Sequence, residues 1–321
     1  MNLFVLLATR NREALLERTL SSLASCRRPQ GYQGTWVVEN GARGATEDVV
    51  RRANPDLKAH YLFEAAGNKS RALNAAMAHI SDGLILFLDD DVRVGADLLE
   101  LHAAAAERAG AGHFFGGPVA PDYEAPPPVW LMRFLPASAK GWEWQDAEVP
   151  IVKPVILGCN WAAFAADIRA IGGFSEQFGP GSATGSIGQE SQMQRRLLAH
   201  GLVGRYVPGA LVYHWVPGGR CSPEFALERI HKDGIRSGLL RYEDLGIGIA
   251  GYPVVLLKRT FDRWLYWHYR RLSGNAADSF AAQVAFRHRL GVLKGVRLSR
   301  RSRASGVDTR IASADDADTI G

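Results

Sequence analysis

The chain has 321 residues, of which 47% are hydrophobic and 22% are charged, a composition that excludes collagen-like and largely disordered proteins. The three cysteines, Cys26, Cys159 and Cys221, are too few and too scattered for a disulfide framework or a zinc site, so we expect a reducing compartment. The net charge of +5 has a local origin, because residues 252–303 hold 12 basic and 2 acidic side chains, against 25 and 27 in residues 1–251. The body is not basic and carries no recognition motif, so we expect no nucleic-acid partner.

Short apolar runs alternate with helical patterns over the first 91 residues, which is typical of βαβ units and a mostly parallel sheet. The first run, Leu3–Ala8, is too short for a signal peptide or a membrane span and is predicted as a strand. The expected strands are Leu3–Ala8, Thr35–Val38, His60–Phe63 and Leu84–Leu88, and the expected helices are Arg12–Ser25 and Lys69–Ile80, the second capped by Asn68.

Three carboxylates, Asp89, Asp90 and Asp91, follow the buried strand Leu84–Leu88 directly. Their mutual repulsion destabilises the fold unless a cation offsets it, and carboxylate oxygens favour Mg²⁺ or Mn²⁺. The alternative is a solvated acidic turn in which Asp91 or a neighbour caps a helix over Gly95–Ala109. Polar residues also follow the first two strands, at Thr9-Arg10 and Glu39-Asn40, and the carboxyl ends of parallel strands share one edge where ligands bind.

The second half of the body is less regular. We expect a strand and then a long, partly ordered loop within Gly110–Pro154, with order returning at Val155–Leu157. The other expected elements are a short helix capped by Asp167 and ended by Gly172-Gly173, a flexible loop over Phe178–Gly188, a helix over Gln192–His200, and strands at Arg205–Val207 and Leu211–Tyr213, the last followed by His214.

Beyond Pro223 the pattern is helical, and Tyr252–Leu272 mixes Trp and Tyr with Lys and Arg. Aromatic and basic residues on one helix suit the surface of an anionic membrane. The alternative is a helix that packs its aromatics on the body and turns its charges to water. Residues 302–321 are polar, small and acidic, and we expect them to be disordered.

The order of these motifs resembles the family-two inverting glycosyltransferases, nucleotide-sugar-dependent enzymes of the GT-A fold. The resemblance covers roughly residues 1–220 and is carried by the four motifs Thr9-Arg10-Asn11-Arg12, Val37-Val38-Glu39-Asn40-Gly41, Asp89-Asp90-Asp91 and Gly188-Gln189-Glu190-Ser191-Gln192-Met193, with His214 after a late strand. It implies a Rossmann-like α/β fold with a mixed, mostly parallel central sheet flanked by helices, followed by a C-terminal helical extension.

The resemblance also implies roles for individual residues. Asp89 and Asp91 match the family's DXD motif, in which the last Asp binds the metal on the donor diphosphate and the first approaches the ribose. His214 matches a position that completes the metal shell, so the implied ligands of Mn²⁺ or Mg²⁺ are Asp91, His214 and Asp89. The implied donor-binding residues are Thr9, Arg10, Glu39, Lys69, Arg71, Asn74, Asp89, Asp90, Asn160 and Trp161, with Glu39 in place of the Asp that usually bonds the base.

The motif at Gly188–Met193 departs from the family's Gly-Glu-Asp-Ser-Glu-Leu. Aligned on Gly188 and Ser191, it puts Glu190 at the position of the catalytic Asp. A register one residue earlier would put Ser191 there, but an inverting transfer needs a base for the acceptor's proton, and a Ser hydroxyl cannot serve unaided. We therefore predict Glu190 as the base, against the simpler reading of a Glu that complements a helix dipole.

The predicted function is metal-dependent, inverting transfer of a sugar, UDP-linked by preference, to a glycan or lipid-linked acceptor in bacterial cell-surface polysaccharide synthesis. The predicted location is cytoplasmic and peripheral on the inner face of the membrane, through residues 252–303. The predicted domains are 1–222, divided into a nucleotide-binding half (1–95) and an acceptor half (96–222), then a basic helical extension (223–301) and the tail (302–321).

Two other classes stay open at this point. A nucleotidyltransferase also places a metal-binding Asp on an α/β sheet, but it usually has a glycine-rich basic loop after the first strand, and Thr9-Arg10-Asn11-Arg12 contains no glycine. The other class is a catalytically weak GT-A scaffold that binds a nucleotide or glycan, which the altered Gly188–Met193 motif favours. No P-loop or dinucleotide fingerprint occurs in the chain.

Overall fold

The computed structural model describes residues 1–144, 149–241, 249 and 252–304, and the chain divides into two compact units. Unit 1 comprises residues 1–126, 135–182 and 189–218. Unit 2 comprises residues 127–134 and 183–188 and the chain from residue 219 onward. The functional halves and domain limits expected from the sequence stay predictions.

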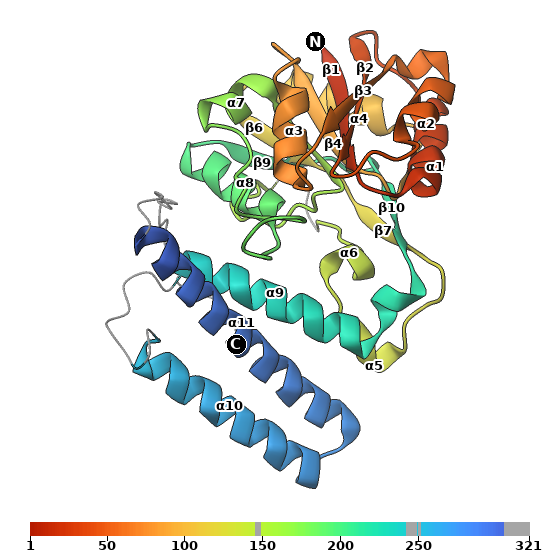
Figure 1. Cartoon of the computed structure of the whole chain (residues 1–321). Coiled ribbons are helices and arrows are strands. Elements are labelled where there is room, and N and C mark those ends of the chain that lie inside the picture. The colour runs from red at the N-terminus through yellow and green to blue at the C-terminus, as the bar shows by residue number, and fades with distance from the viewer. Residues whose placement is uncertain (145–148, 242–248, 250–251, 305–321) are drawn as a thin grey trace. The chain divides into compact units, whose positions relative to one another are not determined.

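A seven-stranded sheet forms the centre of unit 1 (Figure 1). Its first four strands are parallel, and the fifth runs antiparallel to both of its neighbours. The mixed, mostly parallel α/β fold expected from the sequence is therefore confirmed. In spatial order the strands are β3 (Ala59–Glu64), β2 (Tyr32–Asn40), β1 (Leu3–Thr9), β4 (Leu84–Asp89), β8 (Asn160–Phe164), β6 (His113–Gly116) and β9 (Val203–Tyr206).

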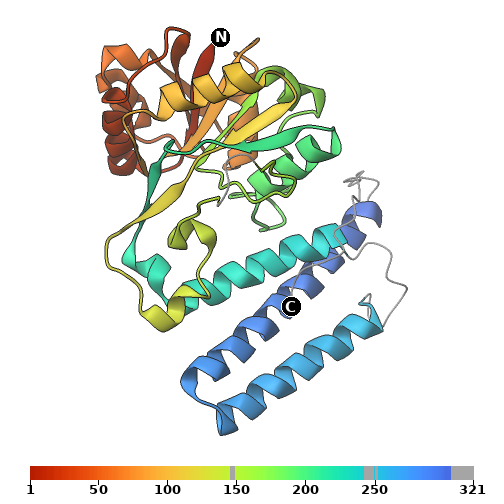
Figure 2. The same cartoon turned by 180° about the vertical axis from the view of Figure 1, so that it is seen from behind.

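Helices cover both faces of this sheet (Figures 1 and 2). Successive side chains of β1 point to opposite faces, and both sets are apolar, so each face needs a cover. Val5 and Leu7 belong to the core beneath one set of helices, and Leu6 and Ala8 to the core beneath the other. The first set is α1 (Glu13–Ala24), α2 (Thr46–Arg52) and α4 (Leu98–Ala109), and the second is α3 (Lys69–Met77), α7 (Ala165–Ala170) and α8 (Gln189–Ala199). As a central strand, β4 is buried from Leu84 to Leu88, as its unbroken apolar run predicts.

A second sheet of three strands, β5 (Val92–Val94), β10 (Val212–Val216) and β7 (Val119–Tyr123), continues from the first. The chain crosses from β4 to β5 through a turn at Asp90 and Asp91. The expected strand Leu211–Tyr213 is in fact β10, which extends to Val216, so His214 lies inside the strand and not after its end. His214 pairs with Val92 of β5, and this register brings its ring beside Asp91.

Other expected elements in unit 1 are present with shifted limits. Asn68 caps α3 as predicted, since its side chain accepts bonds from the backbone N–H groups of Ser70 and Arg71. Helix α4 begins at Leu98 and not at Gly95, and α8 begins at Gln189 and not at Gln192. Asp167 was wrong as a cap, because it lies in the first turn of α7.

The sequence patterns missed several short elements. Helix α2, strands β5, β7 and β8, and the short helices α5 (Val129–Met132) and α6 (Ala137–Lys140) were not expected. Order was expected to return at Val155–Leu157, but the strand there, β8, begins at Asn160. Its sequence, Asn-Trp-Ala-Ala-Phe, contains no β-branched residue, so its strand signal is weak.

Unit 2 contains three long helices, α9 (Pro223–Arg241), α10 (Val254–Ser273) and α11 (Ala276–Ala304), which confirm the helical extension. Close backbone approach joins α9 to α11, since a Cβ atom at Gly234 would lie 2.2 Å from the carbonyl oxygen of His288. Gly238, Gly291 and Gly295 are equally confined. Helix α11 includes residues 302–304, where the disordered tail was expected to begin, and residues 305–321 lie outside the described residues. Within the described parts of the chain, no helix is long and apolar enough to cross a bilayer.

Candidate active site

The register of the parallel strands brings the predicted polar residues to one edge of the large sheet. Thr9 pairs with Glu39 across β1 and β2, and Ala8 pairs with Asp89 across β1 and β4. The three strands therefore end at the same level, as expected for a ligand-binding edge of a parallel sheet.

Asp90 and Asp91 are buried at this edge and are held by Thr9, the last residue of β1, and by Arg12, which follows it. The Thr9 hydroxyl donates to Asp90 Oδ2 at 2.6 Å. One guanidinium nitrogen of Arg12 lies 3.0 Å from Asp90 Oδ1 and 2.9 Å from Asp91 Oδ2. The alternative of a solvated acidic turn is therefore wrong, and Asp91 caps no helix, since α4 begins at Leu98.

The electrostatics of this turn are those of a charged cluster with one built-in counter-ion. Burial raises the pKa of Asp90, and the neighbouring Asp91 adds to that rise. Burial alone would lower the pKa of Arg12, but Asp90 and Asp91 outweigh it and raise that pKa. One guanidinium thus faces two buried carboxylates. Arg12 alone leaves one of the two negative charges uncompensated, so a further cation would be favourable here.

Asp89, Asp91 and His214 each offer one ligand atom, and these atoms all lie within 4.8 Å of one another. His214 Nε2 is 3.4 Å from Asp91 Oδ1, and His214 Nδ1 is buried without a hydrogen-bond partner in the described chain. Two carboxylate oxygens and one imidazole nitrogen form a donor set that suits Mn²⁺ and also accepts Mg²⁺. The residues present therefore fit a divalent cation.

Lys69 joins this cluster to Glu190. Its Nζ lies 2.5 Å from Asp89 Oδ1 and 3.7 Å from Glu190 Oε1. Burial would lower the pKa of Lys69, but the two carboxylates outweigh it and raise that pKa. Burial would likewise raise the pKa of Asp89, yet the Lys69 ammonium holds it below its ordinary value. The lysine is therefore charged and connects a candidate metal ligand with the candidate base.

Two local features place Glu190 in the first turn of α8. A Cβ atom at Gly158 would lie 2.2 Å from Glu190 Cγ, so only glycine leaves room for the Glu190 side chain. The segment before α8 is bonded to the start of α3, where the Lys69 N–H donates to the carbonyl oxygen of Pro180 and the Ser70 hydroxyl donates to that of Phe178. Glu190 therefore lies near Lys69, which supports the alignment that places it, and not Ser191, at the catalytic position.

Glu39 lies at the predicted edge, but its carboxylate is buried and bonded within the protein. The Tyr61 hydroxyl donates to one oxygen and the Gly44 N–H to the other, both at 2.6 Å. Burial and then the bonded Glu39 raise the pKa of Tyr61 to about 12. A nucleobase that used Glu39 would therefore share or displace these donors.

The basic and amide residues predicted beside the donor differ in exposure and in the partners that they already have. Arg10 is exposed at the same edge and donates to the carbonyl oxygen of Gly67. Arg71 makes ion pairs with Glu64 and Glu176, at 3.7 and 4.0 Å. Asn74 both donates to and accepts from the backbone of Phe174, so its amide is used to hold the chain after α7.

Asn160 and Trp161 are placed in the core. The Asn160 amide oxygen accepts a hydrogen bond from His102 Nε2 at 3.0 Å, and its amide nitrogen donates to the carbonyl oxygens of Pro118 and Ala210. The Trp161 ring is 1% exposed and stacks on Phe87, with centroids 4.5 Å apart. Both side chains are buried, so neither offers a free face to a sugar in this structure, and their role as donor contacts stays a prediction.

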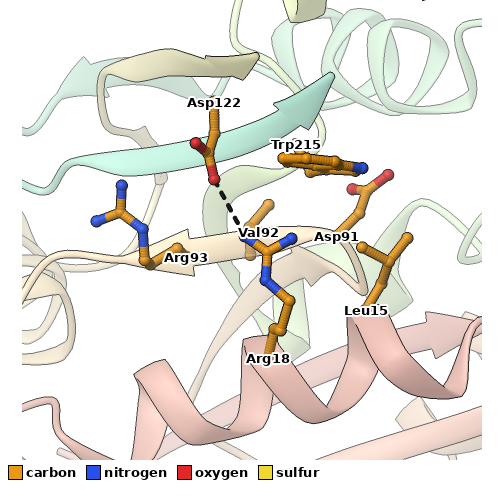
Figure 3. Close-up of a pocket in the computed structure, with 7 residues that line it drawn as sticks. All are labelled: Leu15, Arg18, Asp91, Val92, Arg93, Asp122 and Trp215. Atoms are coloured by element: carbon orange, nitrogen blue, oxygen red, sulfur yellow. Dashed lines mark hydrogen bonds and ion pairs between the residues drawn. The ribbon is translucent and has the colours of Figure 1, made fainter. Parts of the chain in front are cut away.

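A small hollow lies on another side of Asp91, between α1 and the second sheet (Figure 3). Figure 3 shows the Arg18 side chain directed toward Asp122. The Arg18 guanidinium is 3.3 Å from Asp122 and 4.8 Å from the centroid of the Trp215 ring. Its lining consists of Leu15, Arg18, Asp91, Val92, Arg93, Asp122 and Trp215. Asp91 is the residue that this hollow shares with the metal-ligand cluster.

Sequence reasoning missed Arg12 and Gly158 as site residues. Arg12 lies in the quoted Thr-Arg-Asn-Arg motif, and a basic residue just after a strand that ends at an acidic edge is a usable signal. No local sequence signal marks Gly158, because the side chain that needs the space, Glu190, belongs to α8, which begins 31 residues further along the chain.

Comparison with known proteins places the chain among glycosyltransferases. Residues 4–171 match the family model for Glycosyl transferase family 2. Validoxylamine A glucosyltransferases from two strains of Streptomyces hygroscopicus, subsp. limoneus and subsp. jinggangensis, are each 31% identical over 62% of this chain. Those stretches are 48% and 52% of the relatives, so the chain spans about half their length.

Two solved structures share the fold. A mannosyltransferase from Pyrobaculum calidifontis, in complex with GDP-Man and Mn²⁺, has a TM-score of 0.55 at 16% identity, over 96% of this chain and 88% of that one. S. aureus TarS 1-349 has a TM-score of 0.51 at 14% identity, over 98% and 95%. This likeness confirms the expected GT-A fold, and together with the family match it shows that the chain belongs to glycosyl transferase family 2.

Proposed function

We propose that this protein transfers a sugar from a nucleotide-sugar to an acceptor hydroxyl, with inversion at the anomeric carbon. The observation that carries the proposal is the juxtaposition of Asp89, Asp91 and His214 with Lys69 and Glu190 at the ligand-binding edge of the sheet. The curated relatives are named glucosyltransferases, and the structural neighbours include complexes with GDP-Man and UDP-GlcNAc. A UDP-sugar is our preferred donor.

Asp89, Asp91 and His214 would hold a divalent cation, with Mn²⁺ or Mg²⁺ the candidates. Such an ion neutralises the charge that grows on the departing diphosphate. Lys69 and Arg12 would add fixed positive charge beside the same oxygens, in a partly buried setting where electrostatic stabilisation is strong.

Glu190 would act as the base. Its carboxylate is partly exposed, so an acceptor hydroxyl can reach it. The carboxylate takes the hydroxyl proton as the acceptor oxygen bonds to the anomeric carbon, and the bond from that carbon to the diphosphate breaks on the opposite side, which inverts the configuration. Lys69 orients Glu190 through the 3.7 Å ion pair, so it is a positioning residue for the base.

For the donor, we retain Asp89, Lys69 and Arg10 as contacts of the phosphates and ribose, with Glu39, Arg71, Thr9 and Asp90 supporting the same edge. Thr9 and Asp90 act through each other, because the Thr9 hydroxyl is bonded to Asp90. Asn74 would act only by holding the loop at Phe174. These assignments rest on position at the strand ends and on family resemblance.

The acceptor we propose is a glycan or lipid-linked sugar of cell-surface polysaccharide synthesis, met at the cytoplasmic face of the membrane. Support comes from the basic extension, in which residues 252–303 hold 12 basic and 2 acidic side chains. Family membership argues against a nucleotidyltransferase. A catalytically weak scaffold is the remaining alternative, and it would bind the donor without transferring it.

Glu190→Gln separates an enzyme from a scaffold. We expect transfer to fall by about 10²- to 10⁴-fold, because a general base contributes on that scale. Donor affinity, measured by calorimetry with UDP-sugars and Mn²⁺, should stay within a few-fold. A transfer rate equal to that of the parent protein would remove Glu190 from its role.

The matched control is Glu100→Gln. Glu100 also lies in the first turn of a helix, α4, so this change tests the reading of Glu190 as a residue that only complements a helix dipole. Glu100→Gln should leave transfer unchanged. Equal losses of activity in the two variants would show that the effect comes from helix stability and not from proton transfer.

A further inference from the structure

Helix α10 carries an exposed apolar stripe along its whole length. Val254, Phe261, Leu265 and Leu272 follow one another at intervals of seven, four and seven residues, so they lie on one face of the helix. Phe261, Leu265 and Leu272 are 56%, 47% and 91% exposed. Trp264 and Tyr269, which flank this stripe, are exposed as well.

This stripe is not the face by which α10 packs in unit 2. The packed face carries Leu256, which is buried with Val292 and Val296 of α11, and Trp267, which stacks on Phe286. Both overall views show α11 between α9 and α10 (Figures 1 and 2). The alternative to a membrane surface, in which α10 packs its aromatics on the body and turns its charges to water, is therefore wrong for Trp264, Tyr266 and Tyr269, which are exposed.

Such a surface is costly in water. Eight of the large hydrophobic side chains that are exposed in the described chain belong to α10, whereas scattered single residues are the usual pattern. A contiguous apolar stripe of this kind is typical of a surface that binds a membrane or another protein.

The chemistry around the stripe favours an anionic lipid surface. Lys258 and Arg271 border it and are exposed, and on α11 Arg287 and Lys294 are exposed too. Long basic side chains can bury their stems along apolar surface and extend their charges to phosphate groups. Trp and Tyr are the aromatic residues enriched at the interface between acyl chains and water. The stretch is too polar to cross the bilayer, which leaves the interface.

We infer that α10 lies along the surface of an anionic lipid bilayer, with Val254, Phe261, Leu265 and Leu272 among the acyl chains and Lys258 and Arg271 at the headgroup phosphates. This inference deepens the membrane contact in the proposed function, since it assigns the contact to one face of one helix. It does not depend on the identity of the donor sugar.

Co-sedimentation of the full chain with vesicles tests the inference. The parent protein should bind vesicles of phosphatidylcholine with 25% phosphatidylglycerol and should bind pure phosphatidylcholine at least 10-fold more weakly, since each basic residue near an anionic surface contributes about 1 kcal/mol. The double change Phe261→Ser with Leu265→Ser should weaken binding to the anionic vesicles by about 10-fold or more. Circular dichroism checks that the variant keeps its helices.

The matched control changes Val149 and Val152 to Ser, since these apolar side chains are also exposed but lie in unit 1. Their replacement should leave vesicle binding unchanged. Unchanged binding of the α10 variant would overturn the inference. Equal binding of the parent to both vesicle types would also overturn it. A third contrary outcome is that neither protein binds vesicles and sedimentation velocity shows a parent dimer that the α10 variant does not form.

The lipid-binding inference and the proposed sugar transfer can be refuted independently of each other. Glu190→Gln should bind anionic vesicles as the parent does, because unit 1 alone contains Glu190. If the parent protein binds vesicles but transfers no sugar, the proposed activity is refuted and the lipid-binding inference stands. If it transfers sugar but does not bind vesicles, only the lipid-binding inference is refuted.

Discussion

The acidic turn of unit 1 and helix α10 of unit 2 depart in opposite directions from the usual distribution of side chains. At the turn, Asp90 and Asp91 are buried although they are charged. On α10, Phe261, Leu265 and Leu272 are exposed although they are apolar. Both arrangements cost free energy, and our proposals would relieve them with a divalent cation in the first case and a lipid surface in the second.

The two regions differ in how far other side chains of the protein offset the unfavourable free energy. Arg12, Thr9 and Lys69 already neutralise or bond the carboxylates, so the turn is stable before any ligand arrives. No described side chain covers the stripe on α10 in the same way. The buried charges should therefore affect both stability and ligand binding, and the exposed apolar residues should affect binding alone.

The largest effect is expected for Asp91→Asn. Loss of one carboxylate ligand should weaken Mn²⁺ binding by more than roughly 100-fold, beyond the cost of changing an outer-shell partner. Calorimetric titration with Mn²⁺ measures it. Asp90→Asn is the control, because Asp90 is bonded to Thr9 and Arg12 and is outside the cluster of ligand atoms. Equal weakening by both changes would contradict the assignment.

Arg12→Gln removes the counter-ion of the turn. We expect a loss of about 2–3 kcal/mol in the free energy of unfolding, below the 3–5 kcal/mol typical of fully buried pairs because the Arg12 side chain is 37% exposed. Mn²⁺ should raise the melting temperature of this variant more than that of the parent, since it replaces the missing positive charge. Arg10→Gln, an exposed neighbour, is the control and should change stability by less than about 0.5 kcal/mol.

A pH dependence is expected from His102, a buried group of unit 1 with no opposite charge beside it among the described residues. Burial lowers its pKa to about 4, although the bond to Asn160 acts the other way. The unfolded chain, with the ordinary value near 6.5, binds the proton first as pH falls. The stability from the neutral ring is therefore complete above pH 6.5 and is lost toward pH 4, by roughly 2 kcal/mol between pH 7 and pH 5.

Urea unfolding of the parent and of His102→Gln at pH 7 and pH 5 measures this contribution as the difference between the two proteins. Other groups titrate in both proteins and cancel. An identical fall in stability for the two would show that His102 makes no contribution.

The smallest effect is expected on α10. The double change of Phe261 and Leu265 to Ser should alter the free energy of unfolding by less than about 0.5 kcal/mol per site, because exposed positions rarely matter for stability. Trp161→Ala, which empties a buried position in unit 1, should cost about 3–5 kcal/mol. A large loss of stability from the α10 change would mean that the stripe packs within the protein.

The sequence alone determined the elements whose pattern is local and long. The strand Leu84–Leu88, the helix capped by Asn68 and the helical extension follow from an unbroken apolar run, a capping residue and helical spacing. Motif order and family resemblance also predict the composition of the candidate site, with Asp89, Asp91, His214 and Glu190. Residue type restricts chemistry strongly, and these types are readable one by one.

Only the tertiary structure decided which of these residues meet and which are occupied. The pairing of Arg12 with two aspartates depends on strand register, and the need for glycine at position 158 depends on helix α8, which begins 31 residues later. Asn160 and Trp161 looked available in the sequence, but the sheet places β8 between β4 and β6 and uses both side chains inside the core. Contacts between distant segments arise from packing, which leaves no trace in local spacing.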